Sequence, residues 1–217
     1  MSLCVAALVF TGCNGSTRKA DTGQEESTTV KLNSEEIKAA SFNDLFKTVE
    51  AKDVKEDIFT LINKDFSILT AGTSSHYNSM VASWGGWGIL FDKQVTFSFL
   101  RSNRYTLELI RKENKYTMTF FDEEHKEDIM KFGQSSGSVS NDKMTTTALT
   151  AVETPSGNMT YKQAKLIIEL DLFEVTTVLP DDFRTEEARK FVVDAHAETG
   201  EYHKLVFGEI KNIWVRK

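Results

Sequence analysis

The sequence predicts a mainly β fold in which antiparallel strands form a closed barrel and α-helices are appended to it. The hydrophobic content is 40% and the aromatic content 11%, with 15 Phe, which is typical of a globular body rich in strand-forming residues. Short alternating segments recur along the chain, and the helical segments between them lack the regular alternation of a doubly wound parallel sheet. The length of 217 residues favours one domain with one substantial core.

The first strands are predicted ahead of a pair of arginines. Residues 65–72 alternate and end at a glycine, which predicts a half-buried strand that runs into a turn. Residues 78–84 predict a second strand with its small polar side chains on one face, and the glycines after it permit a tight bend or a close backbone approach to a ligand. Residues 94–100 predict a third strand. One face of that strand carries Val95, Phe97 and Phe99.

A helix is predicted to follow the third strand. Residues 106–112 have helical spacing, so residues 101–106 would form the turn between strand and helix. Anions are favoured at such a turn because free backbone N–H groups and the helix dipole point there. Residues 115–121 then predict a fourth strand, and residues 122–132 predict a charged helix that stops at the next residue, a glycine.

The last part of the chain is predicted to complete the sheet. A polar loop over residues 134–143 precedes a long strand over residues 164–175. Residues 205–210 and 213–215 form the last one or two strands. Short lead-in segments between residues 34 and 46, helical or extended, precede the whole series.

The N-terminal segment, residues 1–13, is an apolar run that closes on Thr11-Gly12-Cys13. It resembles the end of a bacterial lipoprotein signal peptide, in which Cys13 would be lipidated; the alternatives are a buried first strand or a misassigned start. Residues 14–33 have the composition of a flexible polar tether. Residues 34–217 then form the folded domain. We therefore expect a body anchored at a membrane surface of the cell envelope, in the periplasm or outside.

The charge and the cysteine content exclude several classes of function. The formal net charge is -6 and the sequence pI is about 5.3, so nonspecific nucleic-acid binding is not expected and any basic site must be local. Both cysteines, Cys4 and Cys13, precede the folded domain, which excludes a cysteine nucleophile or a cysteine metal site there. The histidines at 76, 125 and 196 are scattered and have no ligand spacing, so no metal site is predicted.

The turn with Arg101 and Arg104 combines the features that a flavin mononucleotide requires. Two arginine forks match the geometry of a phosphate monoester and offset its charge. Trp84 can cover one face of a flat ring system. Hydroxyl donors that add no charge are Ser83, Ser98 and Thr106. The alternative interpretations are two ordinary surface arginines at a helix start and a tryptophan of the core.

Six pieces of the chain, in order, resemble the flavin reductase-like FMN-binding split-barrel family, and within it the flavoredoxin-like branch. The resemblance spans about Val49 to Trp214. The matching pieces are Leu69–Gly72, Asn78–Gly86, Phe99–Thr106, Phe120–Glu124, Ser136-Gly137 with Lys143, and His203 with Phe207–Ile210.

The resemblance implies an antiparallel Greek-key split β-barrel, a homodimer, and one FMN per subunit near the subunit interface. It implies that residues 78–84 border the isoalloxazine and the ribityl chain, that Arg101, Arg104 and Thr106 hold the phosphate, and that His203 lies close to the flavin. No catalytic residue of the protein is obligatory, because the cofactor carries the redox chemistry. The predicted FMN-binding residues are Asn78, Ser79, Met80, Ala82, Ser83, Trp84, Ser98, Leu100, Arg101, Arg104, Tyr105, Thr106 and His203.

The expected function is that of an FMN-binding oxidoreductase that moves hydride or electrons through its flavin. Two alternatives stay open at this point. One is an electron carrier at the cell envelope, fed by an unknown donor other than NAD(P)H, and the other is a ligand-binding barrel without redox activity. The sequence leaves the electron donor and the electron acceptor open.

Overall fold

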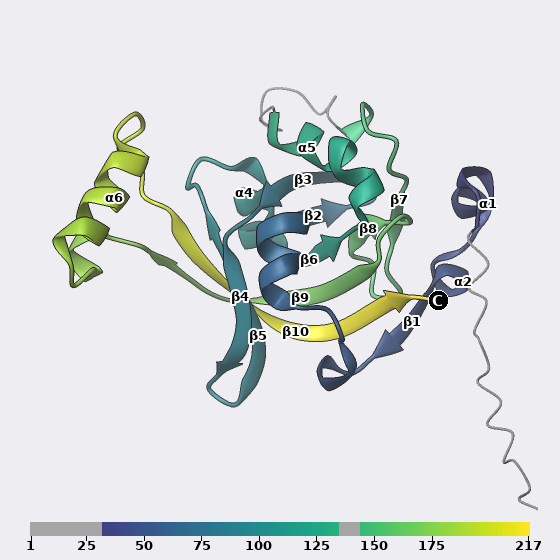
Figure 1. Ribbon diagram of the computed structural model, residues 1–217. Coiled ribbons are helices and arrows are strands. Elements are labelled where there is room, and N and C mark those ends of the chain that lie inside the picture. The colour runs from purple at the N-terminus through teal and green to yellow at the C-terminus, as the bar shows by residue number, and fades with distance from the viewer. Residues whose placement is uncertain (1–31, 135–143) are drawn as a thin grey trace, which may run out of the picture. The chain divides into compact units, whose positions relative to one another are not determined.

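The computed structural model describes residues 32–134 and 144–217 (Figure 1). The contacts between residues divide the chain into residues 1–31 and residues 32–217, and only the second unit is described below. The predicted signal segment, nearly all of the predicted tether, and the predicted polar loop from residue 135 onward lie outside the described residues.

The folded body is built on one antiparallel sheet with the strand order β3-β2-β6-β9-β10-β5-β4, to which β1 adds by pairing with β10. A separate hairpin is formed by β7 and β8. The strands are β1 (Phe46–Val49), β2 (Ser67–Thr73), β3 (His76–Ala82), β4 (Gly85–Leu90), β5 (Lys93–Leu100), β6 (Lys115–Phe120), β7 (Ala151–Glu153), β8 (Met159–Tyr161), β9 (Leu166–Thr177) and β10 (Lys204–Arg216).

Helical segments connect and flank these strands (Figure 1). The α-helices are α1 (Ser34–Ala39), α2 (Phe42–Leu45), α3 (Ile58–Thr60), α4 (Tyr105–Glu113), α5 (Lys126–Gln134) and α6 (Glu186–His196). The 3₁₀ turns are η1 (Ala51–Asp53), η3 (Glu123–His125) and η5 (Pro180–Asp182), and η2 (Leu61–Asp65) is a π-helix. Within the described residues, no helix is long and apolar enough to cross a bilayer.

The sheet is a Greek-key split barrel rather than the closed barrel that the strand pattern predicts. β5 and β6 are consecutive in the chain, yet β9 and β10 lie between them in the sheet, and α4 makes the crossing. No ladder joins β3 to β4 in the described part of the sheet. After β3 the chain turns and pairs with β5 instead. At the first residue of β4, Gly85, a Cβ would lie 2.2 Å from the Phe97 carbonyl oxygen, so the close pairing with β5 requires a glycine there.

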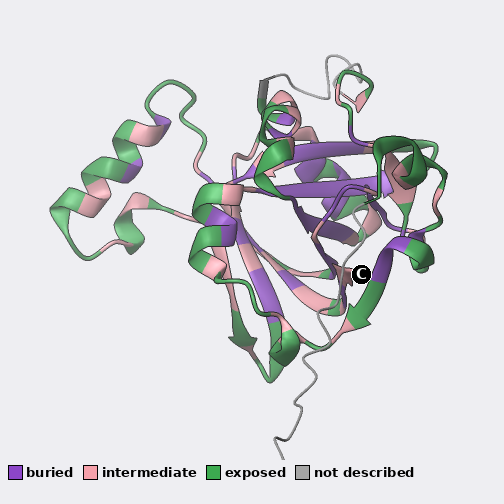
Figure 2. Cartoon of the chain, turned by 45° about the vertical axis from the view of Figure 1, so that its right-hand side comes forward, coloured by how far each residue is buried: buried purple, intermediate pink, exposed green. Residues whose placement is uncertain are grey.

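The sheet is buried on both faces where β2, β6 and β9 run through its middle (Figure 2). On β9, Leu166, Ile168 and Leu170 pack into the barrel interior, whereas Ile167 packs into a second cluster on the opposite side. That second cluster takes apolar side chains from α2 and α5, so these helices cover the outer face. The interior cluster includes side chains of α4 and therefore fixes the turn that precedes this helix.

The two faces of β5 differ in burial: the face that carries Phe97 and Phe99 is partly exposed, and the opposite face is buried. Thr96, Ser98 and Leu100 are almost fully buried, whereas Phe97 and Phe99 stay partly exposed. β10 pairs Phe207 with Phe97 and Leu205 with Phe99. The Phe97 ring centroid lies 6.3 Å from that of Phe99 and 5.9 Å from that of Phe207. We call the four side chains Phe97, Phe99, Leu205 and Phe207 the phenylalanine face.

The other predicted elements agree with the structure in kind and differ at their ends. Residues 205–215 form one continuous strand, β10, with register shifts near Gly208 and Asn212. The predicted stop at Gly133 is wrong, because α5 continues through it. The hairpin β7–β8 and the helix α6 are not predicted by the sequence analysis. α6 lies in an excursion between β9 and β10, at the far left of Figure 1.

Candidate functional site

The turn between β5 and α4 presents two arginines at a helix N-terminus, as the sequence predicts. Leu100 ends β5, Tyr105 begins α4, and the backbone N–H of Arg104 donates to the carbonyl of Arg101 at 3.1 Å. Arg104 occupies the N-cap position, and in the part of the chain that the structure describes no side chain caps the helix there. The free N–H groups of the first turn and the positive end of the helix dipole therefore face the same place as the arginines, which favours an anion.

Neither arginine has a counter-ion among the described residues. Arg101 and Arg104 are both partly buried, and no carboxylate of residues 32–134 or 144–217 forms an ion pair with either of them. The carboxylate of Glu201 bonds to the turn, but it accepts from the Ser102 hydroxyl at 2.5 Å. Two cations at a helix N-terminus oppose the helix dipole, so the arrangement is favourable only when an anion joins it.

Side chains of β3 fix the start of α4. The Asn78 amide donates to the Thr106 hydroxyl oxygen at 2.6 Å, and the His76 ring shares a 2.6 Å hydrogen bond with the Tyr105 hydroxyl. Asn78 is 1% exposed, and its amide oxygen has no partner within the described structure. A buried acceptor without a donor is costly, so this oxygen is suited to a ligand hydroxyl or N–H group.

Several predicted site residues direct their side chains into the body. The Ser79 hydroxyl lies 2.8 Å from that of Thr70 and 2.7 Å from that of Tyr161, and all three are buried. The side chains of Met80, Ala82 and Leu100 belong to the interior cluster, and that of Ser98 is buried on the inner face of β5. Contacts from these positions to a ligand would come from the backbone. Ser83, between β3 and β4, is partly buried.

The aromatic plate and the late histidine lie together beside the arginine turn. Trp84 is 49% exposed, and its ring centroid lies 5.2 Å from that of His203. Burial lowers the pKa of His203 to about 4, and electrostatic interactions with His196, Arg101 and Arg104 add to this effect. The structure therefore brings together Trp84, Arg101, Arg104 and His203, from three separate parts of the sequence.

Sequence analysis misses the role of His196, which it treats as one of several scattered histidines. His196 ends α6, and its Nε2 lies 2.5 Å from Nδ1 of His203. The two residues meet because the chain folds back after α6, where Gly200 has a positive φ and its N–H donates to the His196 carbonyl at 2.8 Å. The sequence spacing does not show that the two rings come into contact. The described residues contain no group of His, Cys, Asp and Glu side chains arranged to hold a metal ion.

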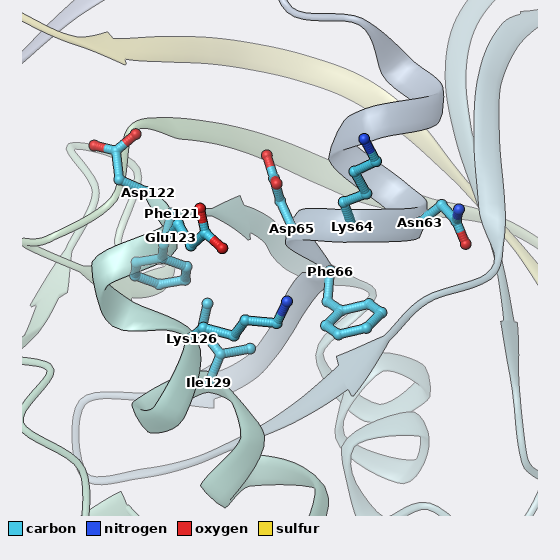
Figure 3. A pocket seen from close by; sticks show the side chains of 9 residues that line it. All are labelled: Asn63, Lys64, Asp65, Phe66, Phe121, Asp122, Glu123, Lys126 and Ile129. Atoms are coloured by element: carbon cyan, nitrogen blue, oxygen red, sulfur yellow. The ribbon is translucent and has the colours of Figure 1, made fainter.

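A separate pocket of about 290 Å³ lies at the start of β2 and shares no residue with the arginine turn (Figure 3). Phe66, Phe121 and Ile129 form its apolar part, and charged side chains of both signs surround it. Asp65 is bound there by Lys165, whose Nζ lies 2.6 Å from its carboxylate. Because the charges are mixed, this pocket does not select an anion. Its lining residues are Asn63, Lys64, Asp65, Phe66, Phe121, Asp122, Glu123, Lys126 and Ile129.

Neither a family model nor a curated protein matches the chain. Solved structures do match. An FMN-binding domain of a flavin reductase-like enzyme from Shewanella baltica OS155 aligns with a TM-score of 0.55 at 13% identity, over 78% of this chain and 76% of that one. The FMN-binding protein from Thermus thermophilus, with 1-cyclohex-2-enone bound, aligns with a TM-score of 0.54 at 16% identity, over 78% and 80%.

The flavoredoxin of Desulfovibrio vulgaris (Miyazaki F) aligns with a TM-score of 0.53 at 16% identity, over 77% of this chain and 76% of that one. At these identities the likeness establishes the fold. The chain has the split-barrel fold of the flavin reductase-like proteins, and the fold class expected from the resemblance is confirmed.

Acidification is expected to destabilise the native chain more than the His203→Gln variant. The pKa of His203 is about 4 in the folded state and near 6.5 in the unfolded state. Between these values the unfolded state binds more protons, so the free energy of unfolding falls as the pH drops through that window. Urea unfolding at about pH 7.5 and about pH 5 measures the difference, with His125→Gln as the matched control. Equal losses in the native chain and in His203→Gln would contradict the assignment.

Proposed function

We propose that the chain is an FMN-binding flavoprotein of the oxidoreductase class, which moves hydride or electrons through its flavin. The observation that carries the proposal is the pair of partly buried arginines at the N-terminus of α4, which have no counter-ion among residues 32–134 and 144–217. The fold supports it, because the solved structures with this fold include FMN-binding proteins. A phosphate monoester carries a charge of about -1.5 to -2 at neutral pH, which two arginines offset.

The residues present fit this cofactor. Arg101 and Arg104 would hold the phosphate together with the first N–H groups of α4. The Thr106 hydroxyl accepts from Asn78 and keeps its own proton to donate, and the unpaired Asn78 oxygen would accept from a ligand hydroxyl or N–H group. Trp84 presents an exposed aromatic ring for a flat ring system. When bound, the flavin would supply the redox chemistry, and these side chains would orient it.

Removing both arginines is expected to weaken FMN binding strongly. Each charge-assisted hydrogen bond to phosphate contributes about 1.5–3 kcal/mol, so Arg101→Ala with Arg104→Ala is expected to raise the Kd for FMN at least about 100-fold. Quenching of flavin fluorescence on titration with the protein measures this Kd.

Arg111→Ala is the matched control, because Arg111 is an exposed arginine in the last turn of the same helix. Its Kd should stay within about twofold of the native value. A native chain that does not bind FMN contradicts the proposal. Equal losses of binding in the control and in the double variant contradict the phosphate site.

The electron donor separates a reductase from an electron carrier. An NAD(P)H-dependent reductase bleaches its flavin with NADH or NADPH under anaerobic conditions, whereas a carrier responds to a protein or chemical donor of low potential. If the chain binds FMN but neither kind of donor reduces the bound flavin, the chain is a binding protein without redox activity.

We propose that two copies of the chain associate through the phenylalanine face. Its side chains, Phe97, Phe99, Leu205 and Phe207, stand side by side on paired strands and remain partly exposed. Contiguous exposed aromatic side chains of this kind mark interaction surfaces. The surface adjoins Trp84 through the backbone bond from the Phe99 N–H to the Trp84 carbonyl at 3.1 Å, which would place the FMN site near the subunit interface.

Phe207→Asp is expected to convert a dimer into a monomer, because a dimer would bury the new carboxylate without a partner. Sedimentation velocity measures the assembly state. Phe59→Asp is the control, since Phe59 is 81% exposed on α3 and lies outside this face. A native chain that is monomeric at concentrations of about 100 μM, where a stable dimer of μM affinity would form, would contradict the proposed interface.

We also propose that Cys13 carries a lipid and that residues 14–33 tether the body to a membrane surface of the cell envelope. The support is the sequence pattern alone, an apolar run that closes on Thr-Gly-Cys before a polar segment. In such a compartment free NAD(P)H would be scarce, so the proposal bears directly on the choice of electron donor. Retention of the native chain in the membrane fraction, and its loss with Cys13→Ser, tests it.

A further inference from the structure

Two buried histidines join the helix α6 to the candidate phosphate site. The Nδ1 of His196 lies 2.5 Å from the carbonyl oxygen of Val192, one turn earlier in α6. The Nε2 of His196 lies 2.5 Å from Nδ1 of His203, and the backbone N–H of His203 donates to the same Nε2 at 3.2 Å. Both histidines are less than 9% exposed.

These contacts favour one tautomer of each ring. A carbonyl oxygen only accepts, so Nδ1 of His196 must carry the hydrogen of that contact. Nε2 of His196 accepts from the backbone N–H of His203 and therefore carries the lone pair. It follows that Nδ1 of His203 donates to it, and that a neutral His203 keeps its lone pair on Nε2. No side chain of the described residues forms a hydrogen bond to that Nε2.

Among the described residues, the positively charged groups that face His203 are two arginines. β10 pairs Lys204 with Leu100, so His203 and Arg101 lie at the same end of the two strands. Arg101 and Arg104 both oppose a positive charge on His203, and His196 contacts it from α6. On its own loop, Glu201 is bound to Ser102, and Tyr202 packs its ring 5.1 Å from that of His196. The neighbouring Lys204 donates to the Thr177 hydroxyl, and the Trp84 ring lies against the histidine. Burial is the main cause of the lowered pKa of His203, and the two arginines lower it further. An anion on the arginines removes their share and adds its own attraction for a protonated ring.

We propose that a phosphate group held by Arg101 and Arg104 binds together with one proton, which Nε2 of His203 takes up, and that His196 is the positioning residue that leaves this nitrogen available. The inference rests on the proposed function in one respect, that the phosphate group belongs to FMN. A phosphate dianion cancels the arginine field that opposes protonation of His203. A protonated Nε2 attracts the dianion, whereas the lone pair of the neutral ring repels it. Binding and proton uptake are therefore linked, and each strengthens the other.

The direct measurement is the number of protons taken up when FMN binds. Calorimetric titrations with FMN at about pH 7.5, in buffers with different ionisation enthalpies, give that number. At this pH the phosphate is largely a dianion and contributes little of its own, since its second pKa is about 6. We expect clear uptake with the native chain, little uptake with His203→Gln, and native uptake with Arg111→Ala. Binding of riboflavin, which lacks the phosphate, is expected to occur without proton uptake.

The affinity gives a second readout. The ratio of the His203→Gln Kd to the native Kd should rise as the pH falls from about 8 to about 6, by up to about tenfold per pH unit for one linked proton. Titration of the phosphate itself affects both proteins equally and cancels in the ratio.

The positioning role of His196 has its own test, in ¹⁵N NMR of the histidine rings. The native chain should show His203 with hydrogen on Nδ1 and a bare Nε2, and FMN should protonate that Nε2. His196→Phe removes the acceptor, so His203 should lose its fixed tautomer and the FMN-linked uptake should decrease. A native chain in which His203 carries its hydrogen on Nε2 before FMN is added would overturn the tautomer assignment.

The outcomes separate the two proposals. FMN binding with equal proton uptake in the native chain and in His203→Gln overturns the proton linkage and leaves the FMN site in place. Absence of FMN binding overturns the proposed function, and the linkage falls with it. If His203→Gln does not fold, the ¹⁵N signal of the native His203 decides, because an Nε2 that stays bare with FMN bound contradicts the linkage.

Discussion

The N-terminus of α4 carries two arginines that form no ion pair with any described residue, and much of the surrounding structure serves to hold that end of the helix in place. Asn78 and His76 tie it to β3, and the interior cluster anchors the helix from the other side. In a loose turn Arg101 and Arg104 could move into solvent, where water would screen their repulsion from each other and from the helix dipole. Because the turn is fixed, the positive field is fixed as well, and an anion is the partner that this arrangement favours.

The same field links the site to the α6 excursion. His203 stands between the arginines and His196, so the protonation of one ring depends on what occupies the arginine turn. The excursion places a helix at the end of long extensions of β9 and β10 (Figure 1). In physical terms its last residue, His196, supplies an oriented acceptor that settles which nitrogen of His203 faces away from the helix. A change in α6 would then alter affinity at the arginine turn without touching the ligand.

The arginine turn could be predicted from the sequence because its signal is local. The apolar alternation of β5, the helical spacing after residue 105 and the two arginines between them lie within about twenty residues, and each follows directly from side-chain periodicity. The burial of Thr96 and Ser98 in preference to Phe97 and Phe99 could not be predicted in this way. Which face of β5 is covered depends on its neighbours in the sheet, and the aromatic face remains partly open where β10 presents Phe207 beside it.

Two further features depend on contacts between distant parts of the chain. The close approach of Gly85 to Phe97, where the chain turns from β3 onto β5, becomes visible only when β4 and β5 are paired. The contact between His196 and His203 depends on the path of the chain between α6 and β10, and the sequence spacing does not show that the two rings come into contact. The fold class and the arginine turn were therefore within reach of sequence reasoning, whereas the histidine pair required the structure.

The most direct test of the account compares FMN with riboflavin on the native chain. The two ligands share the ring system and the ribityl chain, and they differ in the phosphate that the arginine turn is argued to hold. The account predicts that FMN binds at least about 100-fold more tightly than riboflavin at low ionic strength, corresponding to about 3 kcal/mol of charge-assisted binding. Equal Kd values for the two flavins would contradict a phosphate site at Arg101 and Arg104.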